Sequence, residues 1–293
     1  MAITASQVKE LRERTGAGMM ECKKMLQETD GDIEAAIEMM RKSGQAKAAK
    51  KAGRIAADGL VVITASEDGK SAAMAEINCE TDFVAKDESF SSFAGAVAAR
   101  VLNSDVDDVD ALVQQSLHDG EETTIETTRE NLISKIGENI SVRRFVRVAS
   151  SGNIYSYRHG VRIGVVVDME GGDAELGRGI AMHIAASNPI CVSEADVPAD
   201  VLAKEREIFR AQALESGKPE NIVDKIIEGR VRKYLQEVTL NGQPYVIDPD
   251  TTVGEMLEKA GATVISFTRF EVGEGIEKKQ EDFAAEVMAQ INN

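Results

Sequence analysis

The sequence repeats one pattern, a short apolar run followed by a helix, and this repeat limits the folds that the chain can adopt. The run GVVVD at 164–168 is the counterpart of MAEIN at 74–78. The helices that follow match position by position, with Phe90, Phe93 and Ala94 in the first and Ile180, His183 and Ile184 in the second. Since the apolar face of a sheet or helix needs a second layer to cover it, we expect an α+β core that is internally duplicated, with two strand–strand–helix subdomains.

Three helical segments precede this core. Thr4 or Ser6 can cap the first, and TGAG at 15–18 separates it from a second that begins near Met19. The third has apolar residues at the i, i+3, i+4, i+7 spacing of a half-buried helix, namely Ile33, Ala36, Ile37 and Met40. The N-terminal region therefore predicts a three-helix module.

The stretch after the third segment is strongly basic. Six basic residues and no acidic one lie from Arg41 to Arg54, which fits either a solvated linker or an arm that contacts RNA. The whole chain has 34 basic and 50 acidic residues and a formal charge of −16, and this sign of charge repels phosphate backbones and acidic membranes. We therefore favour the linker and expect no stable nucleic-acid binding and no membrane binding.

The segments after residue 55 alternate between strand and helix patterns. Two strand-like runs flank Asp68-Gly69 and predict a β-hairpin, because this dipeptide favours a tight turn. The acidic, Thr-rich segment 103–130 is expected to be irregular, and the following segment includes a strand around Val142 and Val146.

Helical spacing returns past residue 193. The apolar positions are Val201, Leu202, Ile208 and Phe209 on one segment and Ile227, Val231, Tyr234 and Val238 on the return segment. Two antiparallel helices with one apolar seam predict an inserted helical hairpin. The chain then returns to the core through a short helix and a strand, and it ends in an amphipathic helix.

No group of residues indicates covalent enzyme chemistry. The histidines, His118, His159 and His183, lie far apart and away from any nucleophile motif. We expect His183 to be a buried, hydrogen-bonded core residue and His159 to lie in an exposed turn that makes contacts. No cofactor and no metal site are indicated, because the acidic pairs lie in polar loops.

Cysteine usage and the N-terminal residues predict an intracellular protein. Cys22, Cys79 and Cys191 are odd in number and widely spaced, so we expect small buried residues instead of a disulfide framework or a zinc site. The N-terminal residues lack the layout of a secretory signal, and no run reaches the ~18 apolar residues of a spanning helix. We therefore expect a soluble, cytoplasmic protein.

The stretch ETDFVAKDESF, Glu80 to Phe90, places an aromatic residue in a polar turn. Thr81 can cap a helical turn, and Asp82 would meet the positive end of that turn. Phe83 either folds back onto the helix at 90–97 or projects as an anchor for a partner. Burying one phenylalanine contributes about 2–3 kcal/mol, so an exposed one requires a reason.

This stretch is part of a resemblance that covers nearly the whole chain. INCETDFVAK resembles the signature of the bacterial elongation factor Ts family, as do ITASQVKELRERTGAGMMECKKML and GDIEAAIEMMRKSG. The likeness continues in order through KIGENISVRR, HGVRIG, MHIAA, QPYV and RFEVGEGIEKK. The departures are Tyr245 in QPYV, where the family usually has Phe, and a looser match in ICVSEADVP at 190–198.

The resemblance implies a guanine nucleotide exchange factor for elongation factor Tu, the GTPase that delivers aminoacyl-tRNA to the ribosome. In that family, the segment that matches Thr81, Asp82, Phe83 and Val84 intrudes beside the nucleotide site of the GTPase. It helps to dislodge the bound magnesium ion and loosens GDP, after which GTP rebinds. No covalent chemistry is implied.

Four further residues resemble family positions that contact the partner, namely Met19, Met20, Ile136 and His159. Flexible thioethers suit an adaptable apolar contact. For Met19, packing within its own module stays an alternative, because Cys22 and Leu26 follow at i+3 and i+7.

Patterns and resemblance together predict five parts. They are an N-terminal three-helix, UBA-like domain with the basic linker (1–54), a first core subdomain (55–140), a second core subdomain (141–192 and 237–276), the helical hairpin (193–236) and a C-terminal helical module (277–293). The hairpin permits self-association, which leaves 1:1 and 2:2 complexes with elongation factor Tu both open.

Overall fold

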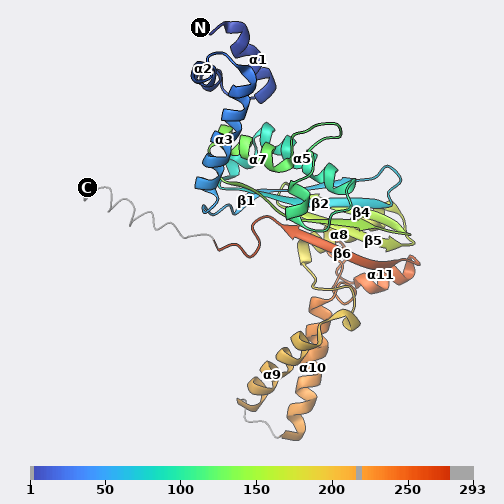
Figure 1. The fold of residues 1–293 in the computed structure, drawn as a ribbon. Helices are drawn as coiled ribbons and strands as arrows, with labels where there is room; N and C mark the ends of the chain where they lie inside the picture. The colour runs from blue at the N-terminus through green and yellow to red at the C-terminus, as the bar shows by residue number, and fades with distance from the viewer. Residues whose placement is uncertain (1–2, 216–219, 278–293) are drawn as a thin grey trace. The chain divides into compact units, whose positions relative to one another are not determined.

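The computed structural model describes residues 3–215 and 220–277. These residues form eleven α-helices, a short 3-10 helix and six strands (Figure 1). The strands make two three-stranded sheets, ordered β1-β2-β3 and β4-β5-β6. The α+β class predicted from the sequence is therefore confirmed. The predicted C-terminal helical module at 277–293 lies outside the described residues, apart from residue 277.

The chain divides into two compact units. Of the described residues, the first comprises 3–60, 75–145 and 272–277, and the second comprises 61–74, 146–215 and 220–271. The finer division into five parts stays a prediction. Among the described residues, no helix is both long enough and apolar enough to cross a membrane.

Three helices begin the first unit, at the positions that the sequence predicts. They are α1 (Ala5–Thr15), α2 (Met19–Glu28) and α3 (Ile33–Lys51). Thr4 caps α1, and Gly16 ends it in the left-handed conformation, with φ +67°. The helices enclose a small core whose fully buried members are Leu11, Cys22, Leu26 and Ala36.

The basic stretch is helical as far as Lys51, the last residue of α3, and its role as a linker stays a prediction. The ammonium of Lys47 donates to Glu21 Oε1 on α2 at 2.7 Å and to Ser134 Oγ at 2.8 Å. Lys51 donates to the carbonyl of Gly137. Because these partners lie far away in the sequence, the run of like charges gives no local sign that it is held against the protein.

The rest of the first unit includes α4 (Asp82–Ala85), α5 (Glu88–Leu102), α6 (Val109–Val113) and α7 (Ile125–Ile136). The expectation of an irregular segment over 103–130 is wrong, because it contains α6 and the start of α7. Thr124 caps α7, and Ile125 and Ile133 are fully buried on it. Burial of these side chains outweighs the low helix propensity of the threonines.

The first sheet contains β1 (Asp58–Ala65), β2 (Ser71–Cys79) and β3 (Ile140–Ala149). The predicted turn at Asp68-Gly69 joins β1 to β2, and Gly69 has φ +69° there. Ser66 N–H donates to the carbonyl of Ser71 at 2.8 Å and closes the turn. The hairpin predicted from this dipeptide is confirmed.

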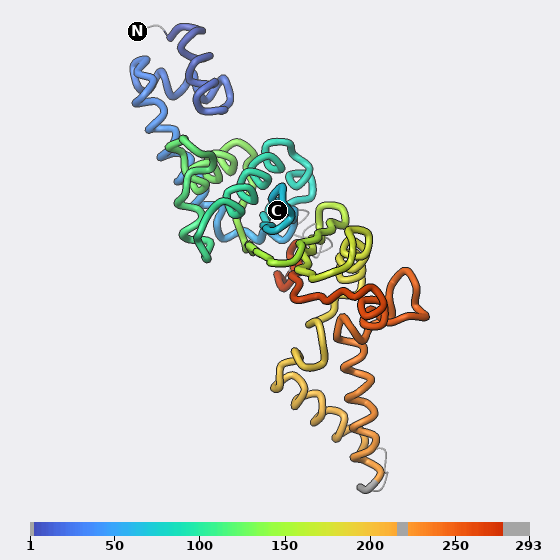
Figure 2. Tube along the Cα trace, turned by 90° about the vertical axis from the view of Figure 1, so that its right-hand side faces the viewer, coloured from blue at the N-terminus to red at the C-terminus, as the bar shows by residue number. Residues whose placement is uncertain are grey.

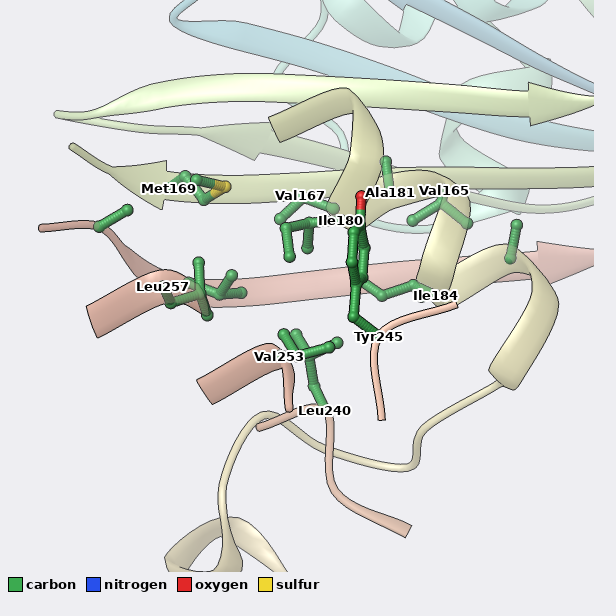
Figure 3. Packing of buried hydrophobic residues seen from close by; sticks show 13 residues of the cluster. Val165, Val167, Met169, Ile180, Ala181, Ile184, Leu240, Tyr245, Val253 and Leu257 are labelled. Atoms are coloured by element: carbon green, nitrogen blue, oxygen red, sulfur yellow. The ribbon is translucent and has the colours of Figure 1, made fainter. Parts of the chain in front are cut away.

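The second sheet contains β4 (Asn153–His159), β5 (Ile163–Glu170) and β6 (Thr263–Glu271), all antiparallel. Helix α8 (Ala174–Ser187) packs on β4 and β5. Figure 3 shows the core of this unit, to which β5 contributes Val165 and Val167 and α8 contributes Ile180 and Ile184. In chain order, β2 is followed by α4 and the apolar helix α5, and β5 by the apolar helix α8. The internal duplication stays a prediction.

The predicted helical hairpin is present in the second unit. It follows a 3-10 turn, η1 (Glu194–Asp196), and consists of α9 (Ala199–Glu215) and α10 (Glu220–Val238), which Figure 2 shows side by side. Its own small core is built from Ala213, Val223, Ile227 and Val231, with Leu202, Phe209, Ile226 and Leu235 packed against them.

Backbone hydrogen bonds join the two ends of the hairpin where it leaves and re-enters the core. Ile190 N–H donates to the carbonyl of Val238 at 2.8 Å, and Leu240 N–H donates to that of Cys191 at 2.9 Å. Asn241 N–H adds a bond to the carbonyl of Val192 at 3.0 Å. The chain then forms α11 (Val253–Lys259), capped by Thr252, and enters β6.

Candidate partner-binding site

The predicted helical turn is present as α4, and it holds Phe83 in solvent. Thr81 caps it, because Val84 N–H donates to Thr81 Oγ1 at 3.4 Å. The side chain of Val84 is buried, whereas Phe83 is 80% exposed. The alternative in which Phe83 folds back onto α5 is therefore wrong. We call residues 80–86 the Phe83 turn.

The carboxylate of Glu138 holds the Phe83 turn in place. Its Oε2 accepts hydrogen bonds from the N–H groups of Glu80, at 3.1 Å, and Thr81, at 3.0 Å. Its Oε1 accepts one from the Thr81 hydroxyl at 2.7 Å. Glu138 follows Gly137, which ends α7 with φ +92°. One side chain thus fixes two successive residues at the start of the turn.

Glu80 makes the reciprocal contact. Its Oε1 accepts a hydrogen bond from Asn139 N–H at 2.6 Å, and its Oε2 lies 3.5 Å from the guanidinium of Arg54. The Asn139 amide donates to the carbonyl of Arg54 at 2.8 Å. The end of β2 and the segment after α7 are therefore clasped by two carboxylates, each bound to the backbone of the other segment.

Two charged side chains, Asp82 and Lys86, lie beside the exposed ring. Lys86 donates to Asp82 Oδ2 at 2.7 Å, and its ammonium lies 6.0 Å from the centroid of the Phe83 ring. The hydrogen bond and the positive charge of Lys86 lower the pKa of Asp82. A carboxylate and an aromatic ring are thus presented side by side on one short turn.

Cys79 lies beneath the turn and is fully buried. Its Sγ donates to the carbonyl of Thr81 at 3.1 Å. Burial, together with the negative charges of Glu138 and Asp58, raises the pKa of this thiol to about 12. It is therefore a packing residue and a weak donor at neutral pH, as expected for a buried cysteine.

The two methionines are at the start of α2 and point away from its core. Met19 is 59% exposed and Met20 is 78% exposed, so the core-packing alternative for Met19 is wrong. Ile136 is the half-buried last residue of α7, two positions before Glu138. Ile136 therefore lies in the same chain segment as Glu138, whose carboxylate binds the Phe83 turn.

The two candidate histidines are both in the second unit. His159 is the exposed last residue of β4, and its Nδ1 lies 3.2 Å from the Tyr157 hydroxyl. His183 is fully buried, as predicted, with Nε2 2.9 Å from Gln243 Oε1. Val246 N–H donates to its Nδ1 at 3.2 Å, and burial lowers its pKa. His183 is therefore a neutral core residue.

Sequence reasoning missed Glu138 and Asn139 as parts of the site. Their partners, Glu80 and Thr81, lie 57 to 59 positions earlier in the chain, and no local pattern connects the two segments. Both residues lie in the family motif KIGENISVRR, and the glycine before them is typical of a helix end, but neither signal shows the contact with Glu80 and Thr81. Among the described residues, no cluster of histidine, cysteine and acidic side chains suits a metal ion.

Comparison with known proteins places the Phe83 turn within a long match. A family model described as Elongation factor TS matches residues 80–274. The elongation factor Ts of Thioalkalivibrio sulfidiphilus is 64% identical over 292 residues, which cover 99% of each chain. That of Methylococcus capsulatus is 60% identical over 292 residues, again 99% of each chain. That of Halorhodospira halophila is 57% identical over 293 residues, the full length of both.

Proposed function

Because this chain belongs to the elongation factor Ts family, whose members are translation elongation factors, we propose that it is a guanine nucleotide exchange factor for elongation factor Tu. The observation that carries the proposal is the exposure of Phe83 on a turn that is otherwise well packed and hydrogen-bonded. A soluble domain gains stability by burying such a ring, so its exposure is explained by a cavity on another protein.

The proposed mechanism is displacement without covalent chemistry. The segment Thr81 to Val84 enters beside the nucleotide site of the GTPase, where the Phe83 ring occupies apolar space and the Asp82 carboxylate disturbs the charges around magnesium. A magnesium ion that bridges phosphate oxygens is among the largest local charges in such a site. Its displacement weakens the hold on GDP, and GTP then rebinds.

Binding linkage makes this effect reciprocal. If the factor lowers the affinity of the GTPase for GDP, then GDP lowers the affinity for the factor by the same ratio. Each tenfold of coupling corresponds to about 1.4 kcal/mol. The contacts of the factor with the GTPase must therefore be made mainly in the state that has lost its nucleotide.

Four residues outside the turn are further proposed contacts with the GTPase, namely Met19, Met20, Ile136 and His159. The methionines are exposed thioethers at the first two positions of α2, and His159 is exposed at the end of a strand. We assign them to docking on the GTPase, because docking distributes binding energy over positions away from the nucleotide. Self-association through α9 and α10 and a cytoplasmic location remain part of the proposal.

The basic residues of α3 do not favour an alternative role in RNA binding. Lys42 pairs with Glu38 at 2.7 Å, and Lys47 pairs with Glu21 at the same distance. Charges that are already paired within the protein release fewer counterions from a phosphate backbone.

The test is release of labelled GDP from purified elongation factor Tu, with and without this protein. We expect substoichiometric amounts of the protein to accelerate release, and excess unlabelled GDP to restore the complex with the nucleotide. An equal rate of GDP release with and without the protein would refute the proposed function.

A further inference from the structure

We propose that Glu138 is a positioning residue of the exchange site, which fixes the Phe83 turn so that the ring and the Asp82 carboxylate reach the GTPase together. The inference rests on the proposed exchange function. Glu138 itself does not project from the turn, and its role is exerted through Thr81 and Glu80.

The turn needs such support because it is too short to be stable alone. Helix α4 has four residues, and an isolated helix of this length does not form in water. Phe83 adds no core packing, since it is 80% exposed. Within the turn, the cap bond from Val84 N–H is long, at 3.4 Å. The position of the ring therefore depends on the buried Val84 and Ala85 after it and on what anchors the backbone before it.

Glu138 supplies this anchor with three hydrogen bonds from one carboxylate. They come from two backbone N–H groups and from the Thr81 hydroxyl, at 2.7 to 3.1 Å. Hydrogen bonds to an ionised acceptor are about twice as strong as neutral ones. Because Thr81 Oγ1 also accepts from Val84 N–H, the carboxylate orients the same hydroxyl that caps α4.

Glu138 is fixed in turn by its neighbours. Lys51, at the end of α3, donates to the carbonyl of Gly137, and Asn139 N–H donates to Glu80 Oε1. The backbone is thus held on both sides of Glu138, which limits where its carboxylate can lie. A ring on a turn that is already ordered loses less conformational entropy when it enters a partner, and this is the physical benefit of the clasp.

Two substitutions separate the parts of this role. Glu138→Ala removes all three hydrogen bonds. Glu138→Gln removes the charge, but its amide oxygen can accept the two N–H groups while its amide nitrogen donates to Thr81 Oγ1. The matched control is Glu126→Gln, which removes a charge on α7 that pairs with Arg129.

The primary measurement is the maximal rate of GDP release from elongation factor Tu at saturating concentrations of each variant. We expect Glu138→Ala to lower this rate about tenfold, the equivalent of one hydrogen bond to a charged group. Glu138→Gln should restore part of it, and Glu126→Gln should match the unmodified protein. The concentration that gives half the maximal rate should change little, because the docking residues are intact.

A second measurement does not depend on exchange activity. Amide hydrogen exchange in the isolated protein should show protection of the Glu80 and Thr81 N–H groups, and Glu138→Ala should remove it. Unchanged protection, or a Glu138→Ala variant with an unchanged maximal rate, overturns the inference. If the unmodified protein fails to accelerate GDP release while the protection is lost as expected, the proposed function fails and the clasp stands as a structural feature.

Discussion

Substitution of Phe83 by alanine should separate stability from exchange. The ring is 80% exposed, so the protein itself covers 100 − 80 = 20% of it. Full burial of a phenylalanine contributes about 2–3 kcal/mol, and the covered fifth therefore contributes at most about 0.6 kcal/mol to folding. Phe83→Ala should leave the urea denaturation midpoint nearly unchanged.

The effect on exchange should be much larger. If the exposed 80% of the ring becomes covered when the GTPase releases GDP, its loss costs about 1.6–2.4 kcal/mol at that step, which slows release about 14- to 50-fold. The assay is the release of fluorescent GDP from elongation factor Tu in a stopped-flow instrument, over a range of factor concentrations.

Phe93→Ala is the matched control with the opposite pattern. Phe93 lies on α5 and is 4% exposed, so its truncation should destabilise the fold by about 3–5 kcal/mol. The reasoning is refuted if Phe83→Ala releases GDP as fast as the unmodified protein, or if it destabilises the fold as much as Phe93→Ala does.

Three further outcomes follow from buried groups. Burial lowers the pKa of His183 from 6.5, so on acidification the imidazole is protonated in the unfolded state before it is protonated in the folded state. The free energy of unfolding should therefore fall as the pH drops below about 6.5. In urea titrations, His183→Gln should reduce this pH-dependent fall in stability. Gly59 has φ +139°, and an added Cβ would lie 2.1 Å from the carbonyl oxygen of Ile77, so Gly59→Ala should cost at least about 1–3 kcal/mol, whereas Gly53→Ala, with open space around it, should cost little. Iodoacetamide at pH 8 should leave Cys79 unmodified in the native protein and alkylate it in urea, because burial raises its pKa to about 12; a native adduct found by mass spectrometry would contradict this.

Features that depend on a few neighbouring residues could be predicted from the sequence. Thr4 and Thr81 cap helices as expected, and Asp68-Gly69 forms the expected turn. Each depends on hydrogen bonds or dihedral preferences within about four residues. The strand and helix periods of the core belong to the same class, because they reflect which face each element buries.

Features that depend on distant partners could not be predicted. The start of α7 at Ile125 is decided by burial against other elements, which the threonines around it do not reveal. The sequence around Lys47 is typical of a linker and does not show that its ammonium binds Glu21 and Ser134. At the candidate site, the orientation of Phe83 stayed open for the same reason. The sequence shows an aromatic residue in a turn, but only the fold determines whether a pocket exists to receive it.

The three backbone bonds that close the base of the α9–α10 hairpin make this arm a removable appendage. The residues that flank it, Ile190 to Val192 and Val238 to Asn241, are already side by side, and the arm has an apolar interior of its own. The length or sequence of the hairpin can therefore change during evolution without a change in the path of the neighbouring strands. A variant in which a tight loop replaces the hairpin should keep the fold of the rest of the unit.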